Sequence, residues 1–230
     1  LQVFIITCDR PEAVERLLQS MAESTALGLP ETYTLIDDSR DVALADTNRS
    51  LVESHNAKAS FQVRYFGLAA RELLLKHLIA AEPGLEDSIR FLLDRQQWGD
   101  IPTYGLSRSL ALLLGVGSRV LVFDDDVLCE AVRSPLPEEP LHFGGITGRK
   151  AVFWPGREAQ DAAKKPLKDS PVALMARQLG TTLTEGIASL NHGNLNDNAL
   201  VDANGAFVRS LSPESLILQT QCSTWGDPGT

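Results

Sequence analysis

Several features that would identify a class of protein are missing from this sequence of 230 residues. It has three cysteines, far apart and without a CxxC pair, which excludes a zinc ribbon or a thioredoxin-type redox motif. Lysine and arginine number 21 against 30 aspartates and glutamates, a formal net charge of −9. This balance argues against a nucleic-acid partner bound by phosphate neutralisation. To bind an anionic ligand, such a protein needs a metal ion or a local arginine cluster.

Long hydrophobic runs are missing too, since none approaches the roughly 20 residues that a membrane helix requires. The longest extends from Leu110 to Val116, so we expect no membrane segment in this chain. No signal peptide is visible, and sparse cysteines suit a reducing compartment, so the expected location is cytoplasmic. The sequence also lacks an initiator methionine, and we expect it to be an excised or mature domain of a larger polypeptide.

The first 130 residues alternate between strand-like and helix-like patterns. Short apolar runs typical of buried strands occur at 2–7, 33–36, 61–66 and 119–123. Between them, apolar side chains recur at helical spacing. Strands that alternate with helices predict right-handed crossovers and a mostly parallel sheet, so the expected fold class is α/β. His77 lies on one of the apolar helical faces and is predicted to be a core histidine.

Beyond about residue 130 the pattern becomes less regular. We expect a polar segment over 157–168, a short helix over 172–179 and a loop over 180–198. We expect strands at 141–147, 151–154 and 206–209, and a strand or helix over 215–219.

Polar clusters follow three of the expected strands. They are Thr7-Cys8-Asp9-Arg10, Asp37-Asp38-Ser39 and Asp124-Asp125-Asp126. Ligands of open parallel sheets bind beyond the carboxyl ends of the strands, so three such clusters on one edge predict a binding site. The alternative is that these residues only form turns and cap helices.

The aspartate triplet carries the most specific chemistry. Consecutive carboxylates repel one another unless they are solvated or share a divalent cation. Asp124 and Asp126 are two residues apart and project to the same side of an extended chain. Mg²⁺ and Mn²⁺ take one or two carboxylates together with phosphate oxygens and water. We therefore predict a Mn²⁺ or Mg²⁺ site at Asp124 and Asp126, through which the protein would hold a diphosphate.

Three segments together resemble the GT-A-fold, family-2-like glycosyltransferases of the nucleotide-diphospho-sugar transferase superfamily. FIITCDRPE at 4–12 resembles their first strand and turn, and LIDDS at 35–39 resembles their second strand. GLSRS at 105–109, a helix and then VLVFDDD at 120–126 resemble their helix-strand unit that ends in the DxD motif. The resemblance implies a GT-A, Rossmann-like sheet flanked by helices. Residues 1–130 would be the nucleotide-sugar-binding half, and residues 131–230 the less regular acceptor-side half of the same domain.

The resemblance implies roles for individual residues. Thr7 and Cys8 match positions that touch the base and its ribose, Arg10 belongs to the same nucleotide-binding turn, and Asp9 is a departure from the family. Asp38 matches the carboxylate that accepts the imide N–H of the base, which favours uracil or thymine over cytosine.

The remaining donor-side roles fall at the helix-strand unit. Arg108 matches a basic residue that borders the diphosphate. Asp124 and Asp125 match ribose-side positions, and Asp126 matches the metal ligand.

A catalytic base is harder to assign, because the Glu-Asp pair usual in inverting relatives is missing. The nearest candidate is the segment from Trp225 to Pro228. Trp225 would stack on the acceptor sugar, and Asp227 would deprotonate the acceptor hydroxyl. The alternative is a surface turn, since Gly-Asp-Pro-Gly strongly favours turns.

The expected function is a metal-dependent, hexosyltransferase-like glycosyltransferase that uses a nucleotide-sugar, with UDP-sugars favoured. The acceptor would be a hydroxyl of a sugar, a lipid-linked or a protein substrate, and inversion is the expectation from the family. One alternative is a nucleotidyltransferase of related fold, against which the glycine-free turn at 7–11 counts. Others are a phospho-acceptor receiver module, which fits the chain length poorly, and a nucleotide-sugar-binding domain without catalysis.

Overall fold

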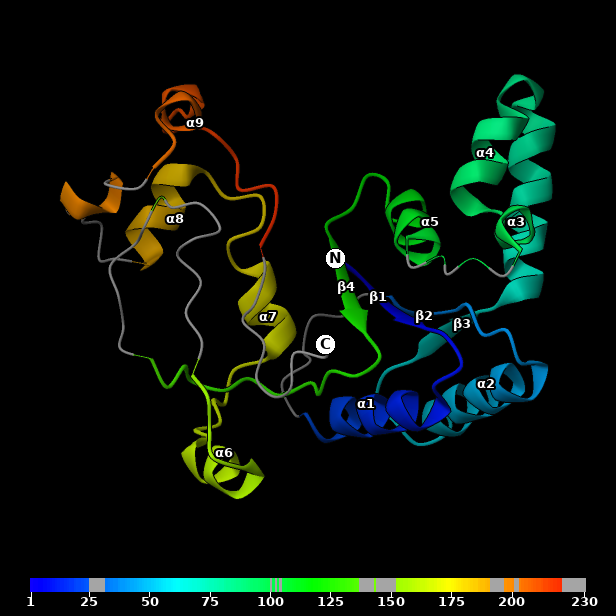
Figure 1. Ribbon diagram of the computed structural model, residues 1–230, viewed down its shortest axis with the longest axis horizontal. Helices are drawn as coiled ribbons and strands as arrows, with labels where there is room; N and C mark the ends of the chain where they lie inside the picture. Colours follow the sequence, from blue (N-terminus) through cyan, green and yellow to red (C-terminus); the bar gives the residue numbers. More distant parts are fainter. Residues whose placement is uncertain are drawn as a thin grey trace. The chain divides into compact units, whose positions relative to one another are not determined.

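The four strand runs of the N-terminal part pair into one parallel sheet in the computed structural model (Figure 1). The structure describes residues 1–24, 32–99, 101, 103, 105–136, 143, 152–190, 197–200 and 203–220. Contacts divide the chain into two units, Leu1–Cys129 and Glu130–Thr230, and the division falls where the sequence pattern changes.

The first unit alternates strands and helices as expected. Its strands are β1 (Gln2–Thr7), β2 (Tyr33–Asp37), β3 (Val63–Phe66) and β4 (Val120–Asp124). Its helices are α1 (Pro11–Glu23), α2 (Val42–Asn56), α3 (Leu68–Ala81), α4 (Glu86–Leu93) and α5 (Leu106–Leu114), with short 3₁₀ turns η1 (Pro83–Leu85) and η2 (Arg95–Trp98). The predicted α/β class with a parallel sheet is confirmed.

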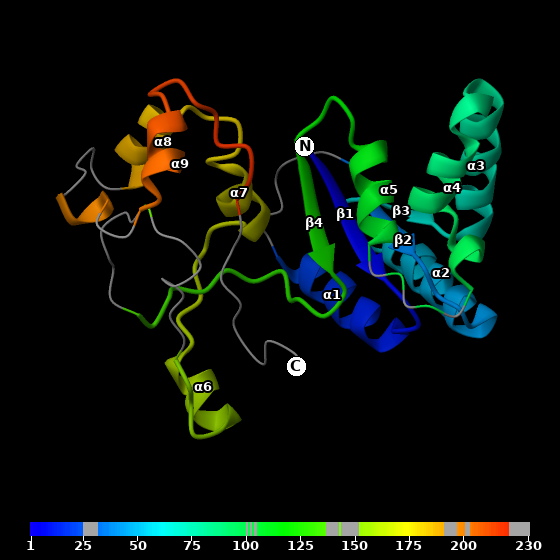
Figure 2. The ribbon, with the colours of Figure 1, turned by 45° about the horizontal axis from the view of Figure 1, so that its top comes forward.

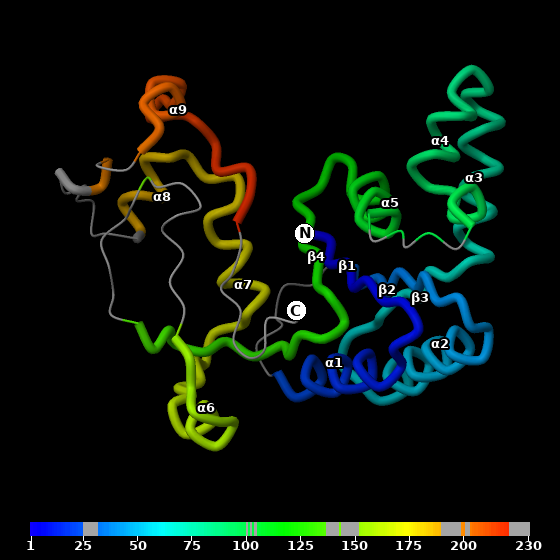
Figure 3. The backbone as a smooth tube through the Cα atoms, in the orientation of Figure 1, coloured from blue at the N-terminus to red at the C-terminus, as the bar shows by residue number. Residues whose placement is uncertain are grey.

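The strands lie in the order β3-β2-β1-β4 across the sheet, and the tube in Figure 3 shows how the chain connects them. This order places β1 between β2 and β4, as in dinucleotide-binding sheets. In a receiver module β1 lies between β2 and β3. The topology therefore excludes the receiver alternative.

Both faces of the sheet are covered by helices, because successive strand residues point to opposite sides and nearly all are apolar. Figures 1 and 2 show α1 and α2 on one face and α3, α4 and α5 on the other. Helix α1 buries an apolar stripe that begins with Val14 and ends with Met21. The core on the α3–α5 side consists of Phe4, Ile6, Ile36, Leu75, Leu93, Leu110 and Ala111.

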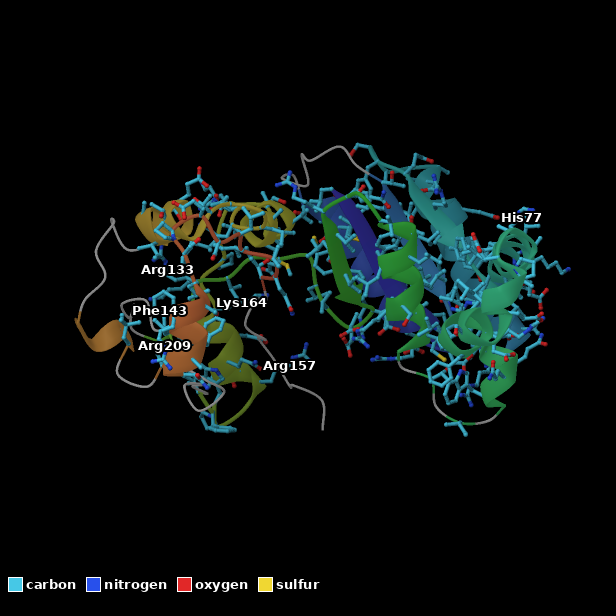
Figure 4. All side chains as sticks on the ribbon, turned by 90° about the horizontal axis from the view of Figure 1, so that it is seen from above. His77, Arg133, Phe143, Arg157, Lys164 and Arg209 are labelled. Atoms are coloured by element: carbon cyan, nitrogen blue, oxygen red, sulfur yellow. The ribbon has the colours of Figure 1, made fainter. Side chains whose placement is uncertain are left out.

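The prediction that His77 is a core histidine is wrong. The buried positions of α3 are Arg71 and Leu75, one helical turn apart. His77 follows Leu75 by two residues and therefore falls on the opposite side of the helix, where it is exposed (Figure 4).

The second unit is mainly helical in the part that the structure describes. It contains α6 (Arg157–Ala163), α7 (Pro171–Ala176), α8 (Leu183–Leu190), the 3₁₀ turn η4 (Asp197–Leu200) and α9 (Gly205–Ser210). Isolated antiparallel bridges join Val132 to Pro166 and Thr182 to Leu216. Lys164, labelled in Figure 4, forms an ion pair with Glu130.

Several predictions for this unit are wrong, and helix caps explain two of them. The segment 206–209 is helical instead of extended, because the Asn204 side chain accepts the N–H groups of Ala206 and Phe207 at the start of α9. The predicted loop over 180–198 contains α8, which begins with a reciprocal cap between Thr182 and Glu185.

The other expectations for this unit had mixed outcomes. The polar segment 157–168 contains α6, residues 152–154 are not a strand, and 215–219 contributes only the bridge at Leu216. The helix predicted over 172–179 is confirmed for residues 172–176, which belong to α7, whereas residues 177–179 are not helical. The strand predicted over 141–147 lies outside the described residues, apart from Phe143.

Candidate functional site

The three polar clusters meet at the carboxyl edge of the sheet. The parallel register pairs Thr7 with Asp37 and Ile6 with Asp124, so β1, β2 and β4 end at the same level. Beyond the ladder, the Asp38 N–H donates to the Thr7 carbonyl at 2.9 Å. The edge therefore gathers the acidic side chains of two strand ends around the turn after β1.

The aspartate triplet, of which Asp124 ends β4 and the other two lie in the turn that follows, has one buried and two exposed side chains. The Asp125 side chain is 5% exposed, while those of Asp124 and Asp126 are 53% and 52% exposed. Thr7 Oγ1 donates to Asp125 Oδ2 at 2.6 Å, and Arg10 Nη1 donates to Asp125 Oδ1 at 2.9 Å. Burial raises the pKa of Asp125, against the opposing effects of the Thr7 hydrogen bond and the Arg10 charge. Asp125 thus faces the protein and ties β4 to β1.

The two exposed carboxylates each contact an arginine. Arg108 Nη2 lies 2.7 Å from Asp124 Oδ1, and Arg10 Nη1 lies 3.2 Å from Asp126 Oδ2. Both arginines are half exposed and come from the first turns of helices or the residue before them. Positive charge therefore accompanies the acidic cluster, although the chain as a whole is acidic.

The exposed pair has the donor chemistry of a hard divalent cation. Mg²⁺ and Mn²⁺ accept carboxylate oxygens from one or two side chains and keep several waters or phosphate oxygens. Among the described residues, no group of three or more histidine, cysteine, aspartate or glutamate side chains is arranged to hold a metal. Asp124 and Asp126 fit such an ion only if a ligand supplies further oxygens.

Asp38 is held by a buried arginine that sequence reasoning missed. Arg71 Nη1 lies 2.6 Å from Asp38 Oδ1, and the two side chains are 3% and 11% exposed. Arg71 also approaches Ser107 Oγ at 3.4 Å. From η2, Arg95 Nη1 donates to the carbonyls of Asp38 and Ser39 at 2.8 and 3.0 Å. The sequence offered one indication of this ion pair, because Arg71 is a charged residue on the otherwise apolar face of α3.

Asp37 is buried, and its carboxylate makes hydrogen bonds that stabilise the turn after β2 instead of facing solvent. Its Oδ1 accepts the Ser39 N–H at 2.9 Å, and its Oδ2 accepts Asn48 Nδ2 at 3.1 Å and the Tyr65 hydroxyl at 2.8 Å. Burial, followed by the hydrogen bond to Asp37, raises the pKa of Tyr65. Of the two adjacent carboxylates, Asp37 supports the turn from inside. Asn48 and Tyr65 belong to that support, and no sequence motif singled them out.

Cys8 lies at this edge as a protonated thiol. Its Sγ donates to the Asp38 carbonyl at 3.2 Å. Partial burial, together with the charges of Asp9 and Asp38, raises the thiol pKa to about 11. A thiol with such a pKa carries little thiolate near neutrality, which argues against a nucleophilic role.

The acceptor side of the expected site is not described. Trp225, predicted to bind the acceptor, and Asp227, predicted to be the base, both lie outside the described residues. The predicted site residues that the structure does describe lie together at the carboxyl edge of the sheet. They are Thr7, Cys8, Arg10, Asp38, Arg108 and Asp124–Asp126.

Comparisons with known proteins find no matching family model, no similar curated protein and no similar solved structure. Among the described helices, none has the length and apolarity needed to cross a membrane.

Proposed function

We propose that this protein binds a nucleotide-diphospho-sugar at the carboxyl edge of its sheet and transfers the sugar to an acceptor hydroxyl. One observation carries the proposal. Two half-exposed carboxylates, Asp124 at the end of β4 and Asp126 in the turn after it, are each paired with a half-exposed arginine. This arrangement offers ligands for a divalent cation and guanidinium groups for phosphate oxygens at the same place.

In this proposal the diphosphate is held by charge. Asp124 and Asp126 would hold Mn²⁺ or Mg²⁺, which supplies stabilisation of the negative charge on the nucleoside diphosphate that leaves. Arg10 and Arg108 stand beside these carboxylates and would orient the phosphate oxygens, since a guanidinium matches phosphate geometry in a bidentate manner. Asp125 would support β4 and Arg10 from beneath.

Asp38 would recognise the nucleotide base. A carboxylate accepts the imide N–H of uracil or thymine, whereas cytosine presents an acceptor at that position. The 2.6 Å contact with Arg71 supports this assignment, because it would hold the Asp38 carboxylate in a fixed position beside the base. Thr7 and Cys8, at the end of β1, would border the base and the ribose. A UDP-sugar is accordingly the favoured donor.

The transfer step rests on the resemblance of the sequence. Trp225 would stack on the acceptor sugar, and Asp227 would take the proton of the attacking hydroxyl. Transfer then breaks the bond between the anomeric carbon and the diphosphate and forms one to the acceptor oxygen.

The proposal is tested by calorimetric titration of UDP, dTDP, CDP and GDP with and without Mn²⁺. We expect UDP or dTDP to bind only with Mn²⁺, and Asp126→Asn to lose this binding. Asp46→Asn removes an exposed carboxylate from α2 and should bind as the wild type does. If the folded wild type binds no nucleotide, or if Asp126→Asn binds normally, the nucleotide site is refuted.

Transfer is tested separately from binding. Asp227→Asn should retain Mn²⁺-dependent UDP binding and lose transfer from a UDP-sugar to an acceptor. Binding without transfer in the wild type, over a broad panel of donors and acceptors, would favour the non-catalytic binding domain instead.

A further inference from the structure

Asp9 has an unusual backbone conformation at the candidate site. Its φ is 54°, and it is the single non-glycine residue with positive φ in the part of the chain that the structure describes. Aspartate tolerates this region better than most residues, because its short side chain can hydrogen-bond to nearby backbone. The conformation turns the chain between β1 and α1 and directs the carboxylate toward the neighbouring turn after β2.

The Asp9 carboxylate joins two turns that belong to different strands. Its Oδ1 accepts the N–H groups of Arg40 and Asp41 at 2.7 and 3.0 Å, and its own N–H donates to Ser39 Oγ at 2.9 Å. These partners are the three residues that follow Asp38. Asp9 thus ties the turn 38–41, which follows β2, to the end of β1.

The remaining supports of this turn act on other atoms. Arg71 contacts the Asp38 carboxylate, and Asp37 accepts the Ser39 N–H from within. Among the described residues, only Asp9 supplies a side-chain acceptor to the N–H groups of Arg40 and Asp41. Loss of the Asp9 carboxylate would remove this acceptor from both donors.

We propose that Asp9 is a positioning residue that holds the turn 38–41 against β1 and thereby sets the place of Asp38. The expected consequence is discrimination between uracil and cytosine nucleotides, and this consequence rests on the proposed function. Asp9 acts through Asp38 and not on the ligand, because its Oδ1 accepts two backbone N–H groups and its Oδ2 is contacted by the Cys8 thiol at 3.7 Å.

Three substitutions separate the backbone conformation from the hydrogen bonds. Asp9→Asn keeps an acceptor oxygen and tolerance of positive φ. Asp9→Gly keeps the tolerance and removes the acceptor, and Asp9→Ala removes both. Asn204→Ala is the matched control, because the Asn204 side chain also accepts two backbone N–H groups, those of Ala206 and Phe207, but at the start of α9 and not in this turn.

The first measurement is hydrogen exchange of the Arg40 and Asp41 amides by NMR, without nucleotide. Exchange should be at least about tenfold faster in Asp9→Gly and Asp9→Ala than in the wild type, and near the wild-type rate in Asp9→Asn. Unchanged exchange in Asp9→Gly would overturn the proposal, whether or not the protein binds nucleotides.

The second measurement is the ratio of the dissociation constants for CDP and UDP in the presence of Mn²⁺. In Asp9→Gly, UDP binding should weaken about tenfold and CDP binding less, so that the ratio falls toward one. Asn204→Ala should lower the melting temperature and keep the ratio, as a purely structural role requires. A wild-type protein that binds neither nucleotide refutes the proposed function, whereas an unchanged ratio in Asp9→Gly refutes the positioning role alone.

Discussion

The buried ion pair between Arg71 and Asp38 lets the cost of an unpaired charge be measured directly. In Arg71→Met the carboxylate loses the guanidinium at 2.6 Å while its side chain stays 11% exposed. Methionine matches the apolar stem of arginine and is a good helix former, so packing and helix propensity change little. The variant therefore isolates the electrostatic loss.

Removing one partner of a buried pair typically costs about 3 to 5 kcal/mol. Arg95 remains 3.7 Å from Asp38 Oδ1 and offsets part of this cost. We therefore expect the lower end, about 3 kcal/mol of unfolding free energy. Such a loss is roughly a hundredfold in the folding equilibrium constant.

The assay is denaturant unfolding of the wild type, Arg71→Met, Asp38→Asn and the double variant, followed by circular dichroism. The double variant should recover most of the loss, because a buried pair replaced as a whole is often nearly neutral. Arg90→Met is the control. Arg90 pairs with Glu86 and Asp94 at the two ends of α4 but is 43% exposed, so its loss should destabilise the protein far less than the loss of Arg71.

Two results would refute this reasoning. One is a cost for Arg71→Met no larger than that of Arg90→Met. The other is a double variant as unstable as Arg71→Met, which would show that lost packing, and not an unpaired carboxylate, causes the effect.

Two further predictions concern groups with a raised pKa. Tyr65→Phe removes the hydroxyl that donates to the Asp37 carboxylate and should cost about 1.5 to 3 kcal/mol by denaturant unfolding near neutrality. The pKa of Tyr65 is raised in the folded state, so the stabilising effect of its hydroxyl is complete below pH 10 and decreases above it. Above pH 10, the free energy of unfolding should therefore fall less steeply with pH in Tyr65→Phe than in the wild type. Equal pH dependence in the two proteins would contradict this prediction. Cys8, with a thiol pKa of about 11 against an ordinary value of 9.0, should react with iodoacetamide at pH 8 about a hundredfold more slowly than free cysteine. Mass spectrometry of the Cys8 peptide measures this rate, and reaction as fast as free cysteine would contradict the protonated state.

The regular part of the fold was predictable because its signals are local. Apolar runs that end in polar clusters marked β1, β2 and β4, and the helical stripe from Val14 to Met21 marked α1. Such patterns reflect burial on both faces of a sheet and on one face of a helix, which depend on nearby residues alone. The second unit was predicted less well, and Thr182-Leu-Thr-Glu185 is a capping pattern that sequence reading could have recognised.

The gathering of polar clusters at the strand ends was predictable, whereas the partners of their side chains were not. The two-residue spacing of Asp124 and Asp126 predicted that they project to the same side, and both are exposed, although Asp126 lies in the turn after β4. The spacing did not indicate that Thr7 would meet Asp125 across 118 residues, or that Arg71 would meet Asp38 across 33. Asn48 and Tyr65 entered the site only through Asp37, from a helix and a strand with no motif of their own.

The sequence by itself determined that this chain forms an α/β unit with acidic turns at the ends of its strands, because these features depend on periodicity and on neighbouring residues. Only the tertiary structure decided which carboxylates face solvent, which are buried against arginine or tyrosine, and that Asp9 joins two turns. The physical reason is that a carboxylate's burial and partners depend on elements that meet only when the sheet and its helices assemble. The local sequence does not indicate which of these elements will come close to the carboxylate.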